Sequence, residues 1–514
     1  MSSRRAFLRK ITYLVILALL MVPLSWMSRP PTIGGAGSPG SAGGKLAQLR
    51  HDYQLSQANL GEIDPASEAI KLATLGMRGV ATNILWTKVN RYKKEEDWTA
   101  MSATLRQITK LQPNFVDVWR HQAWNLSYNV SVEWDDYRDR YYWVIQGINF
   151  LREGERYNQN EPLLLWDLGW FISNKIGRAD EHREFRQLFK EDDDFHGDLP
   201  VAQRDNWLVG KREFERSQAV VDRGLRPLRG MAPHIFHSHP SLCQTHYASA
   251  LAEEGIFDEL GRVAWQQASA DWDQFGNREF RLDTGERVRM NDLDEYVEAA
   301  RAAYLRLDAL APGVRMAIRE ERIAALSPEE RQLLLTPREE LLVEQFEALH
   351  NLQYKLYVGH REVAERLPQS EREEGRRLAL EAEAADELVR RVESYRNTVN
   401  YPYWVVRCRA EQTADAMEAH RQIYLGQRAF READLQTARD AYEAAFRAWY
   451  RVLEQYPPLA VDSITGEEIV EVVRQYREIL DRLDEPLPDD FPLGPLVEYF
   501  EPIMMPQPNA GAGS

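Results

Sequence analysis

The sequence predicts an all-α protein built from stacked helical hairpins, and three observations lead to this prediction. Residues with the amphipathic spacing of helices recur from about residue 65 to 482, Gly and Pro are few outside the two ends, and strand patterns are scarce. The 514 residues include 44% hydrophobic and 28% charged residues, which is typical of a long run of amphipathic helices. A chain of this length exceeds a single hydrophobic core, so we expect several structural units.

The N-terminal segment combines a basic cluster with an uncharged run. Residues 1 to 10 carry four basic side chains, and the uncharged residues 11 to 27 that follow are near the lower length limit for a transmembrane helix. The positive-inside rule then predicts a cytoplasmic N-terminus, a single-pass anchor in the cytoplasmic (inner) membrane and a body on the extracytoplasmic side. Residues 28 to 45, rich in Gly, Pro and Ser, are expected to form a flexible linker. A cleaved signal peptide is the alternative, although small residues are not well placed for a cut close behind the run.

The body of the chain indicates successive helices with recognisable starts. Ser327 and Pro328 pair a capping residue with a proline at the first helical position, and Ser370 has Glu373 placed to close a capping box. Around the turn sequence at 283 to 286, apolar and charged residues alternate as in a β-hairpin. The expected regions of the body are an N-terminal helical-repeat region at 46 to 275, a hairpin with connecting helices at 276 to 336, a C-terminal long-helix and repeat region at 337 to 485, and a Pro-rich, disordered tail at 486 to 514.

The spacing of aromatic and small residues indicates a repeat. Tyr92, Trp98 and Pro113 stand where the tetratricopeptide repeat has two aromatic packing residues and its closing proline, and Trp119 and Ala123 open the next unit. The chain therefore resembles tetratricopeptide-like helical-repeat proteins, most clearly over 80 to 175 and 420 to 457. This resemblance implies helical hairpins stacked as an irregular solenoid, with longer C-terminal helices.

One packing solution occurs twice within this pattern. Trp166 to Gly169 and Trp207 to Gly210 share the form Trp-x-x-Gly, and a glycine there lets two helices approach closely. The residues to which the resemblance assigns packing between helices are Tyr92, Trp98, Pro113, Trp119, Ala123, Leu168, Gly169, Trp207, Gly210, Gly426, Ala438 and Tyr442.

Two phrases point to a second resemblance. Together with the N-terminal uncharged run, Leu75 to Trp86 and Leu111 to Trp119 resemble uncharacterised membrane-anchored proteins of planctomycete-type bacteria, some of which carry the label "iron responsive element". No residue pattern in this chain supports RNA or iron-element binding. The formal net charge of -16, from 64 Lys and Arg against 80 Asp and Glu, also repels phosphates, so nucleic-acid binding is disfavoured.

Possible metal ligands gather between residues 234 and 246. Imidazoles at short spacing can bind zinc, iron or copper, but no zinc-finger, haem-attachment or His-Glu-x-x-His spacing is present. We favour an ordinary loop that runs into a helix, and we assign no metal and no cofactor. The candidate ligands of the metal alternative are His234, His237, His239, Cys243 and His246.

The remaining patterns favour binding over catalysis. The 14 Trp and 22 Tyr residues stand mainly at helical spacing, which favours core packing, although aromatic rings also stack on sugars and on peptide prolines. No nucleophile-elbow, phosphate-loop or dinucleotide motif occurs, so we assign no catalytic residue. We therefore predict a scaffold for an unknown protein or peptide partner. The alternatives are an all-α carbohydrate-active enzyme or sugar-binding protein, and a metal or haem carrier.

Overall fold

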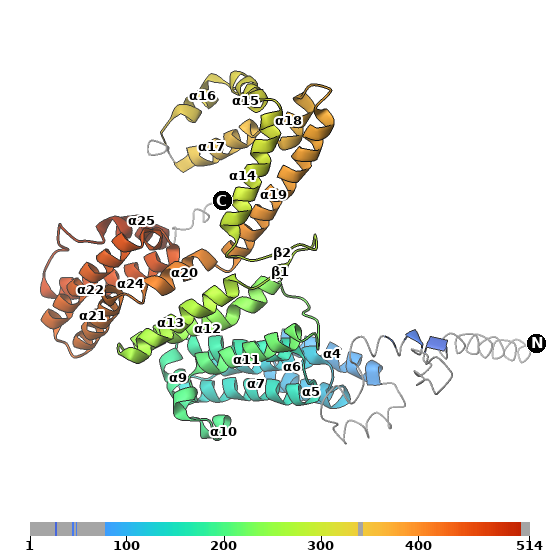
Figure 1. Ribbon diagram of the computed structural model, residues 1–514. Helices are drawn as coiled ribbons and strands as arrows, with labels where there is room; N and C mark the ends of the chain where they lie inside the picture. Colours follow the sequence, from blue (N-terminus) through green and yellow to red (C-terminus); the bar gives the residue numbers. More distant parts are fainter. Residues whose placement is uncertain (1–25, 28–43, 46–47, 49–77, 338–342, 505–514) are drawn as a thin grey trace, which may run out of the picture. The chain divides into compact units, whose positions relative to one another are not determined.

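The structure is a computed structural model that describes residues 26–27, 44–45, 48, 78–337 and 343–504. The elements in these ranges are helices apart from one pair of short strands, which confirms the predicted all-α class (Figure 1). They form two compact units. One holds the described residues up to Ala232 together with His239–Ala250, and the other holds Pro233–Ser238 and the described residues from Leu251 onward. Helix α12 thus supplies residues to both units.

The first unit consists of α-helices that pack in pairs. Helix α4 packs against α5, α6 against α7, and α8 against α11. Helix α5 shows how the sequence forms these helices. At its start, the carboxylate of Asp97 accepts a hydrogen bond from the backbone N–H of Ala100 at 3.0 Å, and one face of the helix buries Met101, Leu105 and Ile108. The α-helices of this unit are α4 (Arg78–Lys94), α5 (Trp98–Leu111), α6 (Val116–Trp124), α7 (Tyr137–Tyr157), α8 (Pro162–Trp170), α9 (His182–Glu191), α10 (Asp193–His196), α11 (Asn206–Asp222) and most of α12 (Pro233–Glu253).

Two of these helices continue into π-helical segments. Asn125–Val130 follows α6, and Phe171–Lys175 follows α8. In the second, the Ser173 hydroxyl donates to the Gly169 carbonyl at 2.6 Å, a side-chain bond of the kind that bends helices. A π-helical turn holds one extra residue, so the apolar stripe shifts beyond it.

Glycines allow the close helix contacts expected from the sequence. A Cβ atom on Gly169 would lie 2.8 Å from the ring of Phe214 in α11, and one on Gly210 would lie 2.9 Å from Cβ of Ser173. The lack of a side chain at both positions therefore allows α11 to lie this close to α8 and the segment that follows it.

The second unit contains a two-stranded sheet and several longer helices. Strands β1 (Phe280–Arg281) and β2 (Arg287–Val288) pair antiparallel, which confirms the β-hairpin, and Gly285 takes the left-handed φ of 94° that its turn requires. Helix α14 packs along α19, α21 against α22, and α24 against α25. Its helices are α13 (Glu259–Gly276), α14 (Leu293–Leu310), α15 (Val314–Ala324), α16 (Pro328–Leu335), α17 (Val343–Leu356), α18 (His360–Arg366), α19 (Arg372–Thr398), α20 (Tyr401–Ala410), α21 (Ala414–Arg431), α22 (Leu435–Gln455), α23 (Pro457–Ala460), α24 (Ser463–Leu483) and α25 (Gly494–Met504).

The predicted helix starts had different outcomes. Ser327 and Glu330 form a complete capping box at the start of α16, where Pro328 takes the first helical position. Ser370 does not cap α19, because it lies inside a turn in which the Glu371 N–H donates to the Pro368 carbonyl at 2.9 Å. Helix α19 begins two residues later, without a side-chain cap.

The segment after α24 differs from the disordered tail expected there. Its apolar residues bury against α22 and α24, and α25 forms from Gly494 to Met504. The frequent prolines end and redirect short segments without preventing this burial. The last part of the expected tail, residues 505 to 514, lies outside the described residues.

The predicted membrane attachment requires correction. Within the described ranges, every helix is either too short or too polar to cross a lipid bilayer. This finding contradicts the transmembrane partner helix and the location in the cytoplasmic membrane, and we withdraw both predictions. The expected span at residues 11 to 27 itself lies outside the described residues, apart from Trp26 and Met27.

Candidate functional site

The C-terminal helices share one large apolar core. Along α22, small and aromatic residues recur every three or four positions, so that one face of this helix is buried against α21 and α24. Gly426 of α21 meets the Tyr442 ring, from which a Cβ atom on the glycine would be only 3.0 Å away. The Tyr442 hydroxyl bonds to Oε1 of Gln475 at 2.9 Å, which satisfies its polar end. This tightly packed core supports the surface features described below.

A buried ionic network ties α20 to α21 and α24. Nε of Arg407 lies 2.6 Å from a carboxylate oxygen of Glu411, and its Nη2 lies 2.8 Å from Glu468. His420 of α21 contacts the other Glu411 oxygen at 2.8 Å. Burial alone would raise the pKa of the Glu411 carboxyl, but His420 and Arg407 outweigh this effect and lower the pKa to about 2. Since each charge in the network has a partner, we infer that the network stabilises the packing of these helices and does not bind a ligand.

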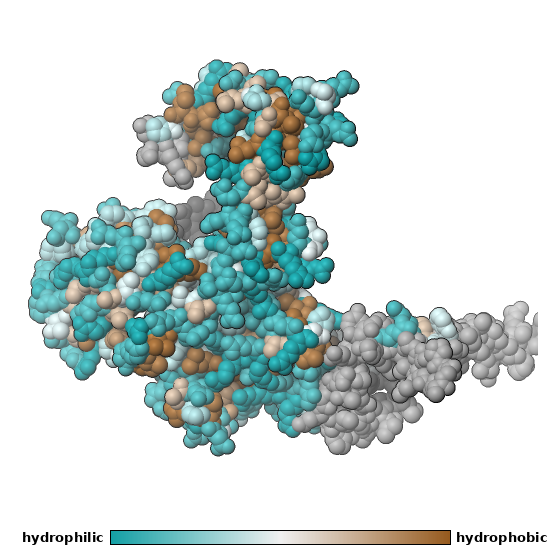
Figure 2. Space-filling view, in the orientation of Figure 1, coloured by the Kyte–Doolittle hydropathy of each residue, from teal (hydrophilic) through white to brown (hydrophobic). Residues whose placement is uncertain are grey.

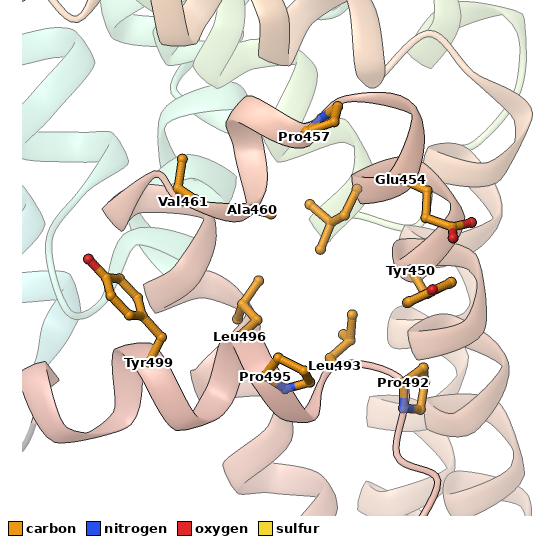
Figure 3. A pocket seen from close by; sticks show the side chains of 11 residues that line it. Tyr450, Glu454, Pro457, Ala460, Val461, Pro492, Leu493, Pro495, Leu496 and Tyr499 are labelled. Carbon is orange, nitrogen blue, oxygen red and sulfur yellow. The ribbon is translucent and has the colours of Figure 1, made fainter. Parts of the chain in front are cut away.

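An open apolar pocket lies next to this core, at the ends of α22, α23 and α25 (Figure 3). Its volume is about 520 Å³, within the range usual for ligand pockets. Figure 3 shows side chains from the three helices around one hollow, with the rings of Tyr450 and Tyr499 on different sides of it. The lining residues are Tyr450, Leu453, Glu454, Pro457, Ala460, Val461, Pro492, Leu493, Pro495, Leu496 and Tyr499.

The pocket combines a firm floor with an exposed apolar rim. Leu453, Leu493 and Leu496 belong to the buried core, whereas Tyr499 is 61% exposed and Val461 is 74% exposed. Hydrophilic side chains dominate the visible surface of the C-terminal helices, and apolar side chains gather in small patches (Figure 2). The rim residues are therefore exposed to solvent and do not belong to the core, which makes this pocket the first candidate for a binding site.

A second, more polar pocket lies between α14, α15, α18 and α19. Nε2 of the buried His360 contacts Asp386 at 2.9 Å, and Nδ1 accepts from Arg315 at 3.2 Å, so both ring nitrogens are occupied. Arg315 also forms a bidentate pair with Asp308. With a volume of about 210 Å³ and no ring nitrogen left to act on a ligand, this pocket is the weaker candidate.

The metal-ligand candidates of the sequence lie on one helix but face different neighbours. His234 stacks on Tyr395 at 4.1 Å, and His237 contacts Phe280. His239 contacts Trp166 at 5.0 Å, and His246 contacts Trp207 at 4.7 Å. Over the part of the chain that the structure describes, no group of three or more His, Cys, Asp or Glu side chains could hold a metal ion.

Of the last members of this set, Cys243 is buried and His246 is partly buried in the first unit. Burial and the nearby Arg178 guanidinium lower the pKa of His246 to about 3, which keeps its ring neutral. Burial raises the pKa of the Cys243 thiol to about 12. The other cysteine, Cys408, is likewise free and buried. Neither thiol is accessible, and Nε2 of His246 is already in contact with Arg178 at 2.7 Å.

The aromatic residues of the first unit divide between core and surface. Trp119 is buried against Phe150, whereas Trp124 is exposed and stacks on Tyr128 with ring centroids 5.6 Å apart. Lys175 places its ammonium 4.7 Å from the centre of the Tyr128 ring. Sugar binding at such exposed rings stays a prediction.

The structure buries most of the residues to which the repeat pattern assigned packing, and it leaves Tyr92 and Trp98 partly buried in the cores of the first unit. The apolar pocket, by contrast, was not indicated by any motif. A cluster of Pro and Leu at 492 to 496 was its only sequence signal, and composition assigned that stretch to the tail.

Comparison with known protein families and with curated proteins gives no match to this chain.

Proposed function

We propose that this chain is a protein-binding scaffold that holds an apolar segment of a partner in the pocket formed by α22, α23 and α25. The observation that carries the proposal is the exposed apolar rim over a buried leucine floor. Exposed tyrosines favour this function, because Tyr contributes disproportionately to binding energy at protein interfaces. The resemblance of the sequence to tetratricopeptide-like proteins supports the same function, since such repeats present rigid surfaces to peptides.

Site-specific crosslinking tests the proposal. A photoreactive phenylalanine analogue at position 499 of the full chain should form a discrete adduct with a protein from cells that produce the chain. The same analogue at position 354, where Tyr354 is also exposed in the second unit, should not. The adduct at 499 should disappear in the double variant Tyr450→Ala and Val461→Ser, which removes rim contacts without touching the floor.

The control is structural. Both substituted side chains are exposed, Tyr450 by 42%, so we expect the thermal unfolding of the double variant to shift by no more than a few degrees. Equal adducts from positions 499 and 354, or an adduct that persists in the double variant, would show that the pocket does not bind the partner.

A further inference from the structure

We infer that the partner segment held by this pocket is cationic as well as apolar, with Lys or Arg residues beside its hydrophobic anchors. This inference rests on the proposed function and concerns the chemistry of the same site. The pocket and the charge around it are separate observations, so each can be tested alone.

The charge around the pocket is one-sided. Between positions 450 and 501 the sequence has 13 Asp or Glu residues against 4 Arg, with no Lys and no His. Each of these arginines is already paired with an acid: Arg451 with Asp415, Arg474 with Glu471, Arg477 with Glu501 and Arg482 with Glu478. The excess of acid is therefore not compensated by the bases of the segment itself.

Several of the remaining acids stand next to lining residues. Glu454 lines the pocket, Glu498 precedes Tyr499, and Asp489 and Asp490 come shortly before Pro492. Among the described residues, no basic side chain forms an ion pair with any of these four acids. The Tyr450 hydroxyl hydrogen-bonds to Glu454 without neutralising its charge, and Glu498, Asp489 and Asp490 adjoin lining residues in the sequence. Carboxylates without a basic partner beside the pocket attract cations and repel an acidic segment.

The same charges argue against two other occupants. A second copy of this chain carries the same net charge of -16 and would bring like charges together at the pocket. A purely apolar segment would fill the hollow but would leave the carboxylates partly desolvated without a partner, which is unfavourable. A segment with both apolar and basic residues would fill the apolar hollow and also pair with the carboxylates beside it.

Defined peptides separate the two contributions. We would compare three fluorescein-labelled helical peptides of about 14 residues, a length of roughly 21 Å. One combines Lys and Leu, one replaces each Lys by Glu, and one keeps Lys but replaces Leu by Ser. Fluorescence anisotropy with the full chain should show tight binding of the Lys and Leu peptide alone. Its binding should weaken at least about tenfold in the variant Tyr450→Ala and Tyr499→Ala.

The charge contribution has a matched control. The double variant Glu454→Gln and Glu498→Gln should bind the Lys and Leu peptide several-fold more weakly, and the affinity that remains should depend less on salt concentration. Glu347→Gln with Glu373→Gln removes the same charge from other exposed helices and should leave binding unchanged. If the Glu and Leu peptide bound, and lost its binding in the tyrosine variant, the pocket would bind a partner but the partner would not be cationic. If the Lys and Leu peptide bound equally well to the tyrosine variant, both the cationic partner and the binding role of the pocket would be disproved.

Discussion

Replacement of Glu411 by glutamine should lower the free energy of unfolding of the C-terminal helices by about 3–5 kcal/mol. The substitution keeps the size of the side chain but leaves Arg407, a buried cation, without the carboxylate that lies 2.6 Å from it. Hydrogen exchange over α20 to α22, together with urea unfolding followed by tryptophan fluorescence, would measure the loss.

A matched variant removes the other carboxylate of the same arginine. Glu468 is 54% exposed, so Glu468→Gln should cost no more than about 1 kcal/mol, as is usual for a solvated ion pair. Equal losses for the two variants would mean that burial does not decide the strength of this network.

Acid should remove part of the same stability. Because the pKa of Glu411 is about 2 in the folded chain against an ordinary 4.5, its charged form favours folding. This contribution is fully present above about pH 4.5 and is lost as the pH falls towards 2. The difference in stability between the unmodified chain and Glu411→Gln should therefore shrink across this window. A constant difference from neutral pH down to pH 2 would contradict the low pKa.

Replacement of Trp119 by alanine should cost about 3–5 kcal/mol in the first unit. Its ring lies 4.7 Å from Phe150 and 5.8 Å from Tyr157, and its Nε1 donates to the Pro113 carbonyl at 2.8 Å. Since these contacts all lie within the first unit, the loss should appear as faster hydrogen exchange over residues 80 to 175 before the C-terminal helices are affected.

Trp124→Ala is the control for this prediction. Trp124 is exposed and lies on the same helix as Trp119, so its removal should change exchange little. If Trp119→Ala left exchange and melting unchanged, the packing role of Trp119 would be disproved.

Periodicity predicted the parts of the fold that depend on local sequence. The helical class, the β-hairpin around Gly285 and the helix start at Ser327 and Pro328 all rest on residues close together in the chain. Ser370 shows the limit of such patterns. Its spacing to Glu373 suits a cap, but the turn closed by Pro368 places the helix start elsewhere.

The pocket could not be predicted because its walls come from separate segments. Tyr450 and Tyr499 stand far apart in the sequence, and only the packing of α25 against α24 brings them to one hollow. The prolines of the last segment indicated disorder, since composition does not show that Phe491 and Phe500 reach an existing core. The acidic bias of the region was visible in the sequence, but without the pocket it indicated only a solvated surface.

The two buried cysteines have a practical consequence. With the thiol pKa of Cys243 at about 12 and Cys408 inside the C-terminal core, neither thiol is reactive under mild conditions. A single cysteine introduced at an exposed position would therefore be the dominant site of maleimide labelling in the otherwise natural chain. Pairs of such labels would allow distances within either unit to be measured by resonance energy transfer without first removing the native cysteines.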